Sequence, residues 1–146
     1  MNERLKQLYQ SVILKHSKEP VHYEKNETAS CVLDAYNPLC GDRYQLFFDI
    51  RDGMVEHMSF YGYGCAVSKA STSVLVKRLR GRPVEDALQL CREFHALLRE
   101  EGASPAADNE EFAAFAAARS FPGRMKCATL SWDEMELFLE EYRARG

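Results

Sequence analysis

Apolar residues near the start of the chain recur at intervals of three and four positions. The residues that follow this pattern are Leu5, Leu8, Tyr9, Val12 and Ile13. Such spacing places them along one face of an α-helix, with polar and charged residues on the other face. Asn2 is a suitable cap for a first turn, and a helix cannot continue through Pro20. The pattern therefore predicts an amphipathic helix that begins near Asn2 and ends before Pro20.

Residues 30–61 show the alternation that is typical of strands. We expect a first strand over residues 31–36 and a last strand over residues 55–61, with a further strand between them. In this middle strand the apolar residues of one face are Tyr44, Leu46, Phe48 and Ile50. Asp52-Gly53 is a strong hairpin signal between the second and third strands. The segment therefore predicts a small antiparallel sheet.

The second half of the chain predicts helices separated by glycine and proline. Small residues after Cys65 begin a helix that should end at Gly81. Pro83 is expected at the first position of the next helix, where its missing N–H costs little. The apolar stripe of this next helix is Val84, Ala87, Leu88, Cys91, Phe94 and Leu98. The segment Gly102-Ala103-Ser104-Pro105 should end the helical pattern.

Two pairs of residues resemble capping boxes and predict two further helix starts. Asp108 with Glu111 precedes a short segment rich in Ala and Phe. Ser131 with Glu134 precedes the last apolar stripe of the chain, which consists of Met135, Phe138, Leu139 and Tyr142. On this interpretation Cys127 lies just before the C-terminal helix.

These elements predict an α+β domain with a three-stranded antiparallel sheet and helices packed mainly on one side of it. The chain has 146 residues, of which 46% are hydrophobic. This is enough for one substantial core and too little for two, so we expect residues 1–146 to form a single domain.

Composition argues against several classes of partner. The formal net charge of -3 provides no electrostatic surface for nucleic acid, and no apolar run is long enough to span a membrane. The N-terminus lacks the basic and apolar regions of a secretory signal, so we expect a cytoplasmic protein. In the reducing cytoplasm, five cysteines favour metal binding or catalysis over a disulfide framework.

Three of these cysteines, with one aspartate, predict a metal site. Cys40 and Asp42 lie on either side of Gly41, so a thiolate and a carboxylate can turn toward one centre. Cys65 and Cys127 would complete a tetrahedral set, which suits zinc. Cys40 is expected in an exposed loop, and Cys65 at a helix N-terminus that favours a thiolate.

Simpler roles remain open for each of these residues. Asp42 is also a plausible turn residue that bonds its own backbone, and Cys65 or Cys127 could be a small packed side chain. Cys31 and Cys91 lie on apolar faces and are better explained as sheet and core residues. The four histidines have no mutual metal-ligand spacing, and we expect His95 to be a solvated helix residue.

The cysteine segments resemble the SufU-type branch of the IscU-like (NifU N-terminal) family of iron-sulfur assembly proteins. The segments that carry the resemblance are Asn37-Pro38-Leu39-Cys40-Gly41-Asp42, Gly62-Tyr63-Gly64-Cys65 and Arg124-Met125-Lys126-Cys127. The resemblance implies the IscU-like fold and a metal site at Cys40, Asp42, Cys65 and Cys127. It also implies a role near that site for Arg124, which could attract a thiolate or an incoming persulfide; a plain solvent-exposed charge is the alternative.

The resemblance further implies a zinc-dependent sulfur acceptor, with Cys40 as the nucleophile that receives persulfide sulfur from a SufS-type cysteine desulfurase. Downstream iron-sulfur assembly proteins would be the other partners. The alternatives are a scaffold that holds an iron-sulfur cluster on the same ligands and a purely structural zinc site. Lys126 stands where the scaffold branch typically has histidine, the Leu-Pro-Pro-Val-Lys motif of that branch is absent, and a long segment separates Cys65 from Cys127. These departures favour the SufU-type branch.

Overall fold

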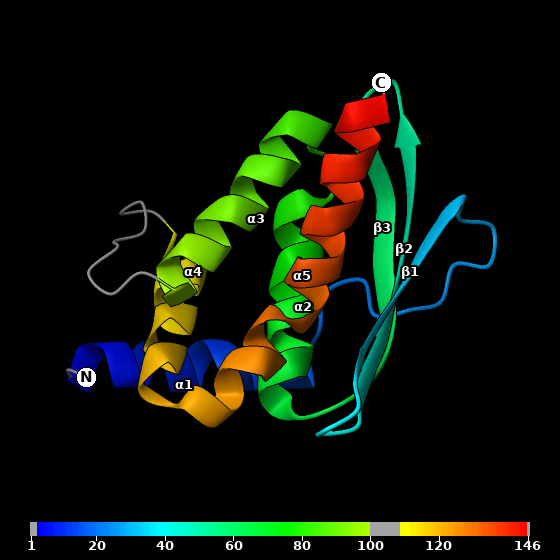
Figure 1. Cartoon of the computed structure of the whole chain (residues 1–146). Helices are drawn as coiled ribbons and strands as arrows, with labels where there is room; N and C mark the ends of the chain where they lie inside the picture. Colours follow the sequence, from blue (N-terminus) through cyan, green and yellow to red (C-terminus); the bar gives the residue numbers. More distant parts are fainter. Residues whose placement is uncertain (1–2, 100–108, 146) are drawn as a thin grey trace.

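The computed structural model describes residues 3–99 and 109–145. Its elements occur along the chain in an order that places the sheet between the first and second helices (Figure 1). They are α1 (Glu3–Lys18), β1 (Cys31–Asn37), β2 (Asp42–Arg51), β3 (Met54–Tyr63), α2 (Ala66–Leu79), α3 (Val84–Arg99), α4 (Glu110–Ala116), the 3-10 helix η1 (Ala117–Ser120) and α5 (Pro122–Arg145).

The sheet is antiparallel throughout, with the strand order β1-β2-β3. In its register Ala35 pairs with Tyr44, and Leu46 pairs with Phe60. All four of these side chains are buried, because the helices cover the face of the sheet on which they lie (Figure 1). The fold class predicted from the sequence is confirmed, including the hairpin at Asp52-Gly53.

Helices α2 and α5 pack closely behind this sheet because α2 is rich in small residues. The Ser71 hydroxyl donates a hydrogen bond to the Ala128 carbonyl of α5, and it accepts one from Trp132 Nε1 at 3.0 Å. Trp132 also stacks on Phe94 of α3, with ring centroids 4.2 Å apart. The predicted stripe of α3 is buried in the same core. No helix within the described ranges has the length and apolar character needed to cross a membrane.

The C-terminal helix begins earlier than the sequence pattern predicted. Helix α5 starts at Pro122, so Ser131 lies inside the helix and Cys127 lies in its second turn. The expected cap at Ser131 is therefore wrong. Its buried hydroxyl instead forms a hydrogen bond with Thr72 Oγ1 of α2 at 2.8 Å. This tertiary contact satisfies the serine within the helix, and no glycine or proline between Arg124 and Arg145 interrupts the helix.

Two other helix starts also differ from prediction. Pro83 precedes α3 rather than opening it, and its carbonyl accepts the first helical hydrogen bond, from Ala87 N at 2.9 Å. Asp108, the predicted cap of the short Ala- and Phe-rich helix, lies outside the described residues. Asn109 caps α4 instead, since its side-chain oxygen accepts from Phe112 N.

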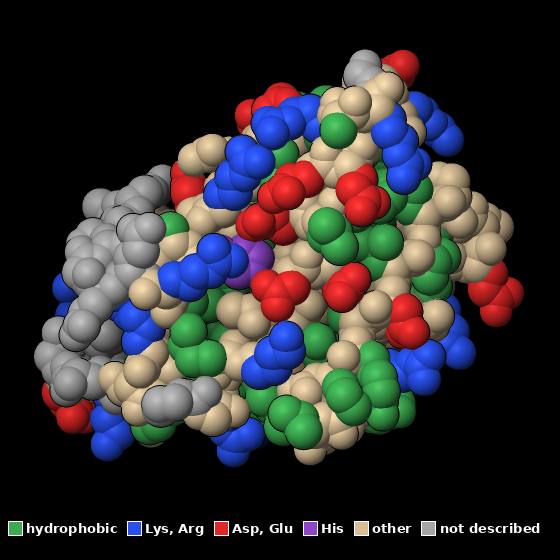
Figure 2. Space-filling model, viewed as in Figure 1, with side chains coloured by type: hydrophobic (Ala, Val, Ile, Leu, Met, Phe, Trp, Pro, Cys, Tyr) green, Lys and Arg blue, Asp and Glu red, His purple; other side chains and the backbone are tan. Residues whose placement is uncertain are grey.

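His95 is buried rather than solvated. Its two ring nitrogens lie 2.7 Å from Glu136 and 2.6 Å from Asp133 of α5. Burial disfavours the charged imidazole, but the hydrogen bonds to Asp133 and Glu136 outweigh it and raise the pKa of His95. The residue therefore links α3 to the helix that carries Cys127, and acidic and basic side chains are interspersed on the surface of these two helices (Figure 2).

A buried ionic cluster joins α1, α2 and α4. The Glu111 carboxylate lies 2.6 Å from His16 Nε2, 2.9 Å from Lys77 Nζ and 2.8 Å from an Arg78 nitrogen. His16 Nδ1 forms a further hydrogen bond with Ser73 Oγ at 2.7 Å. Burial opposes ionisation of Glu111, but its hydrogen bonds with His16 and Lys77 and the nearby charges lower its pKa to about 2. The carboxylate is therefore ionised throughout the physiological range.

This cluster predicts an acid-sensitive contribution to stability. Because the folded state lowers the pKa of Glu111 from 4.5 to about 2, the contribution is complete above pH 4.5 and is lost as the pH falls through that interval. Glu111→Gln should lower the free energy of unfolding by about 1–3 kcal/mol at neutral pH. The difference from the wild type should shrink between pH 4.5 and pH 2, as followed by urea unfolding. Glu110→Gln, an exposed neighbour, is the matched control; an equal loss in that variant would contradict the assignment.

Candidate metal centre

Three of the predicted ligands meet at one point in the fold. One ligand atom each from Cys40, Asp42 and Cys127 lies within 4.8 Å of the other two. Cys40 comes from the turn between β1 and β2, Asp42 from the first residue of β2, and Cys127 from α5. Sulfur and carboxylate donors in this arrangement suit a divalent metal ion such as zinc.

The turn between β1 and β2 presents Cys40 to solvent. Asn37 and Asp42 are the last pair of the ladder, and four residues connect them. The Asn37 side-chain oxygen accepts from Leu39 N, and its carbonyl accepts from Gly41 N at 2.8 Å. Gly41 has φ 77, a conformation that glycine adopts without a Cβ penalty. Cys40 is exposed at the tip of this turn, next to Leu39, which is 92% exposed.

The Asp42 carboxylate is buried and held by one of its oxygens. Oδ1 accepts a hydrogen bond from Cys65 N at 2.9 Å and another from Ser68 Oγ at 3.2 Å. Oδ2 faces Cys127 Sγ at 3.6 Å. Gly64 permits this approach, because a Cβ at that position would lie 2.5 Å from Asp42 Oδ1. One oxygen therefore fixes the carboxylate while the other points toward the thiols.

Cys65 lies beside this group but is not part of the compact set. It caps the N-terminus of α2, and its Sγ accepts a hydrogen bond from Ser68 N at 3.4 Å. The predicted position at a helix N-terminus is thus what the structure shows. Its sulfur still interacts with Cys127, as the pKa of the Cys127 thiol shows. Its role as the fourth ligand stays a prediction.

Cys127 is only 1% exposed, and burial raises the pKa of its thiol to about 12. A hydrogen bond with Cys65, the Cys65 charge and the Asp42 carboxylate contribute to this increase. A buried thiolate among anionic neighbours needs a compensating cation, which a divalent metal ion supplies. The donor chemistry of this site therefore fits a metal ion.

Arg124 lies in the first turn of α5, on the side of the two thiols. The Cys65 charge and a hydrogen bond with Cys127 raise the pKa of the exposed Arg124 guanidinium. Its positive charge thus faces the sulfur ligands. Arg124 was assigned a role near the thiols only through the family resemblance. A plain solvent-exposed charge was the alternative.

The other two cysteines lie elsewhere. Cys91 is fully buried in the core, and burial raises the pKa of its thiol. Cys31 is half-buried at the start of β1 and packs against the core. Neither belongs to the compact group of Cys40, Asp42 and Cys127 that the described residues form.

Sequence reasoning missed three residues that support the site. Ser68 links Asp42 to Cys65, and Tyr44 OH forms a hydrogen bond with Ser68 Oγ at 3.0 Å. Asn37 is 2% exposed, and its Nδ2 has no hydrogen-bond partner among the described residues. A serine three residues after a predicted helix cap was the available signal for Ser68. Asn37 lies in the motif segment that contains Cys40, which gave it no role of its own, and nothing in the local pattern distinguishes Tyr44 from an ordinary strand residue.

The chain is similar to known proteins over nearly its whole length. The family model described as the NifU-like N terminal domain matches residues 8–146. The zinc-dependent sulfurtransferase SufU of Bacillus subtilis is 35% identical over 138 residues, which cover 92% of this chain and 91% of that protein. The iron-sulfur cluster assembly scaffold protein IscU of Streptococcus pyogenes is 31% identical over 133 residues, which cover 91% of this chain and 83% of that protein.

A solved structure shares the architecture. The crystal structure of the N-terminal part of a nitrogen-fixing NifU-like protein from Brucella abortus superposes with a TM-score of 0.81. The match covers 97% of this chain and 99% of that one at 20% identity. At this identity the likeness supports the fold alone.

Substitution of single cysteines tests the predicted ligand set. Cys127→Ser and Cys65→Ser should lose bound metal and stability, because metal-binding free energy contributes to folding. Cys31→Ser and Cys91→Ser should keep the metal, although a hydroxyl in place of Cys91 will cost about 1–3 kcal/mol of stability in the core. Elemental analysis of the four purified variants gives the metal content. A Cys91→Ser variant without metal beside a fully loaded Cys127→Ser variant would contradict this ligand assignment.

Proposed function

This chain belongs to the NifU-like N-terminal domain family of IscU-like proteins, and from that membership we propose that it is a zinc-dependent sulfur acceptor in iron-sulfur cluster assembly. The observation that carries the proposal is the difference in solvent exposure among the residues of the site. Cys40 is exposed on a turn, whereas its neighbours Asp42 and Cys127 are each 1% exposed. A donor enzyme can thus reach one thiol while two ligands stay in the interior.

Four residues would hold the zinc ion: Cys40, Asp42, Cys65 and Cys127. The bound ion keeps coordinating thiols deprotonated at neutral pH. The Asp42 carboxylate is the hardest donor of the set and the one least suited to a metal that favours sulfur, so it is the ligand most easily displaced. The likeness to the zinc-dependent sulfurtransferase of Bacillus subtilis supports zinc as the metal.

The proposed reaction is a transfer of one sulfur atom without net oxidation or reduction. The Cys40 thiolate attacks the outer sulfur of a persulfide on a cysteine desulfurase. A new S–S bond forms at Cys40 Sγ, the S–S bond of the donor breaks, and its electron pair returns to the donor cysteine as a thiolate. Cys40 then carries the persulfide for the downstream assembly proteins.

Arg124 would position the incoming persulfide. Its guanidinium interacts with Cys65 and Cys127, and the residue is exposed, so it is accessible to an anionic sulfur that approaches from outside. Attraction between the guanidinium and the persulfide anion would bring the outer sulfur toward Cys40. Lys126, two residues later, is exposed and lies 4.0 Å from Asp133. Lys126 is therefore a suitable control for Arg124, because it is a positive charge on the same helix.

The surface around the turn is suited to a protein partner. Leu39, Tyr36 and Tyr63 are exposed to 92%, 52% and 64%, at or near the end of the sheet that carries Cys40. Exposed apolar and aromatic side chains next to a reactive thiol favour docking of a protein. We propose a SufS-type cysteine desulfurase as this partner, with downstream iron-sulfur assembly proteins as recipients in the cytoplasm.

A scaffold role is the second candidate. The IscU scaffold of Streptococcus pyogenes is 31% identical to this chain, close to the value for the sulfurtransferase. Cysteine thiolates also bind iron-sulfur clusters, so the same four residues would hold a cluster before its delivery. The two candidates differ in the metal that the purified protein carries.

Metal content tests the choice between these candidates. The sulfur acceptor should carry about one zinc ion per chain in both aerobic and anaerobic preparations, as four ligands form one tetrahedral site. Elemental analysis and an absorption spectrum make the measurement. A stoichiometric iron-sulfur chromophore with little zinc in the anaerobic preparation would favour the scaffold instead.

Sulfur transfer tests the proposed reaction. With a cysteine desulfurase and free cysteine, the wild type should accelerate desulfurase turnover and gain the mass of one sulfur atom on the peptide that contains Cys40. Cys40→Ala should abolish both effects and leave the fold largely intact, because its side chain is exposed. Arg124→Gln should slow transfer about tenfold or more, as the loss of a charge-assisted contact predicts, and Lys126→Gln should not. Sulfur found on Cys65 or Cys127 in the wild type would contradict the role of Cys40.

A further inference from the structure

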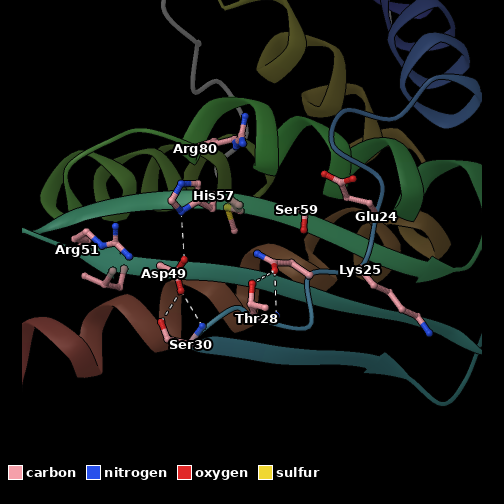
Figure 3. A pocket seen from close by; sticks show the side chains of 12 residues that line it. Glu24, Lys25, Thr28, Ser30, Asp49, Arg51, His57, Ser59 and Arg80 are labelled. Carbon is pink, nitrogen blue, oxygen red and sulfur yellow. Dashed lines mark hydrogen bonds and ion pairs between the residues drawn. The ribbon is translucent and has the colours of Figure 1, made fainter.

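A polar pocket opens on the face of the sheet that is turned away from the helices (Figure 3). The chain between α1 and β1 crosses this face, and it is tied to β3 by the hydrogen bonds of Glu24 N with the Phe60 carbonyl and of Phe60 N with the His22 carbonyl. Residues from this segment, β2, β3 and the end of α2 enclose about 780 Å³. Asp49 of the pocket lies seven residues along β2 from Asp42, or roughly 23 Å at the rise of a strand. The pocket is therefore separate from the metal centre.

Ser59 gives the first indication of a ligand. It is only 3% exposed and lines the pocket, yet its Oγ has no hydrogen-bond partner among the described residues. An unpaired buried hydroxyl costs free energy, so native structures rarely keep one without a reason. A ligand in the pocket would supply the missing partner.

The backbone gives a second, independent indication. The pairing of β2 with β3 shifts register between Phe47 and Asp49, which is a β-bulge. The extra residue is in β3, where His57 and Met58 lie opposite Phe48, and His57 has φ 54, a left-handed conformation that is uncommon for a residue other than glycine. Bulges of this kind redirect side chains beside binding sites, and strained residues cluster there. The bulge places the His57 ring beside Asp49 at the pocket wall (Figure 3).

Asp49 is committed to holding this arrangement. One carboxylate oxygen accepts hydrogen bonds from Ser30 N at 2.8 Å and Ser30 Oγ at 2.7 Å. The other oxygen lies 3.3 Å from His57 Nδ1. The hydrogen bonds from Ser30 lower the pKa of Asp49, so the residue stays ionised and orients the His57 ring, whose Nε2 is left for a ligand.

The lining has Arg51 and Arg80 toward one end, and Glu24 and Lys25 at the other (Figure 3). Arg51 has only a 3.9 Å contact with Glu56, and Arg80 uses one nitrogen for His22, at 2.8 Å. The remaining guanidinium N–H groups that line this end have no further partner within the described residues. Glu24 likewise forms no ion pair there and lies near Ser59 (Figure 3). Such a lining favours a ligand that carries both an anionic group and a hydrogen-bonding group.

We propose that this pocket binds a small organic acid that also carries a hydroxyl or amino group. The carboxylate of the ligand faces Arg51, Arg80 and His57, and its hydroxyl or amino group pairs with Ser59 Oγ beside Glu24. The presence of Glu24 and Asp49 disfavours a doubly charged phosphate, because like charges repel at this range. A singly charged carboxylate avoids most of that repulsion.

Amide chemical shifts of the zinc-loaded full chain test the proposal. L-serine and L-lactate are the probes, with ethanolamine as the comparator that lacks a carboxylate and inorganic phosphate as the other anion. At least one of the two acids should produce saturable shifts at Ser30, Asp49, His57 and Ser59, without change at Cys40. Ethanolamine and phosphate should bind at least tenfold more weakly. Failure of both acids to saturate, or equal binding of phosphate, would overturn the proposal.

Matched variants locate the binding. Arg51→Gln should weaken binding of the acid about tenfold. Arg43→Gln removes the same charge from the same strand, outside the pocket, where Arg43 pairs with Asp34 at 2.9 Å, and it should leave the affinity unchanged. Equal affinities of the two variants would overturn the assignment of Arg51.

Ser59→Ala distinguishes a binding role from a packing defect. Removal of an unpaired hydroxyl should leave the melting temperature of the free protein unchanged or raise it. Binding of the acid should nevertheless weaken about fivefold or more if the hydroxyl pairs with the ligand. An unchanged affinity would show that the hydroxyl is only a buried defect and would overturn its role.

Discussion

The Asp42 carboxylate is the group on which the arrangement of the metal centre depends. It is a buried charge, and burial of a charge is unfavourable unless the surrounding groups compensate for it. Part of the compensation comes from the N-terminus of α2, through the hydrogen bonds from Cys65 N and Ser68 Oγ. These bonds fix the start of β2 against the start of α2, and they leave the second oxygen facing Cys127. A metal ion at the thiols would supply the rest of the compensation.

Helix α5 brings Cys127 to the candidate metal centre because α2 and α5 pack at close range. Small side chains on α2 allow the backbones to approach, as the bond between the Ser71 hydroxyl and the Ala128 carbonyl shows. Ala128 follows Cys127 directly, so this contact also sets the depth at which the Cys127 sulfur lies. His95 adds a second constraint through Asp133 and Glu136, farther along the same helix. The position of Cys127 is thus determined by contacts that α5 makes just after it and in the next turns of the helix.

The sequence predicted what depends on local pattern and failed where distant residues decide. Helical stripes and the Asp-Gly turn were enough for the fold class, because they record which face of each element is buried. Ser131 looks like a helix cap because Glu134 follows it, but its partner Thr72 lies 59 residues away. His95 looks solvated until Asp133 and Glu136 are brought beside it. Motifs singled out Cys40, Asp42, Cys65 and Cys127 as candidate ligands, whereas they gave no role to Asn37, Ser68 or Tyr44.

The pocket on the outer face was invisible to sequence reasoning for the same reason. His57 and Ser59 fit an ordinary strand pattern, and only the bulge and the crossing segment turn them into a pocket wall. At the candidate metal centre, the residues differ in how deeply they are buried. Asp42 and Cys127 are fixed by contacts to two helices, while Cys40 sits on a four-residue turn exposed to solvent. Exposed turns open at lower free energy than packed elements. In the proposed reaction the turn can therefore move Cys40 toward a donor persulfide while the buried Asp42 and Cys127 side chains keep their positions in the fold.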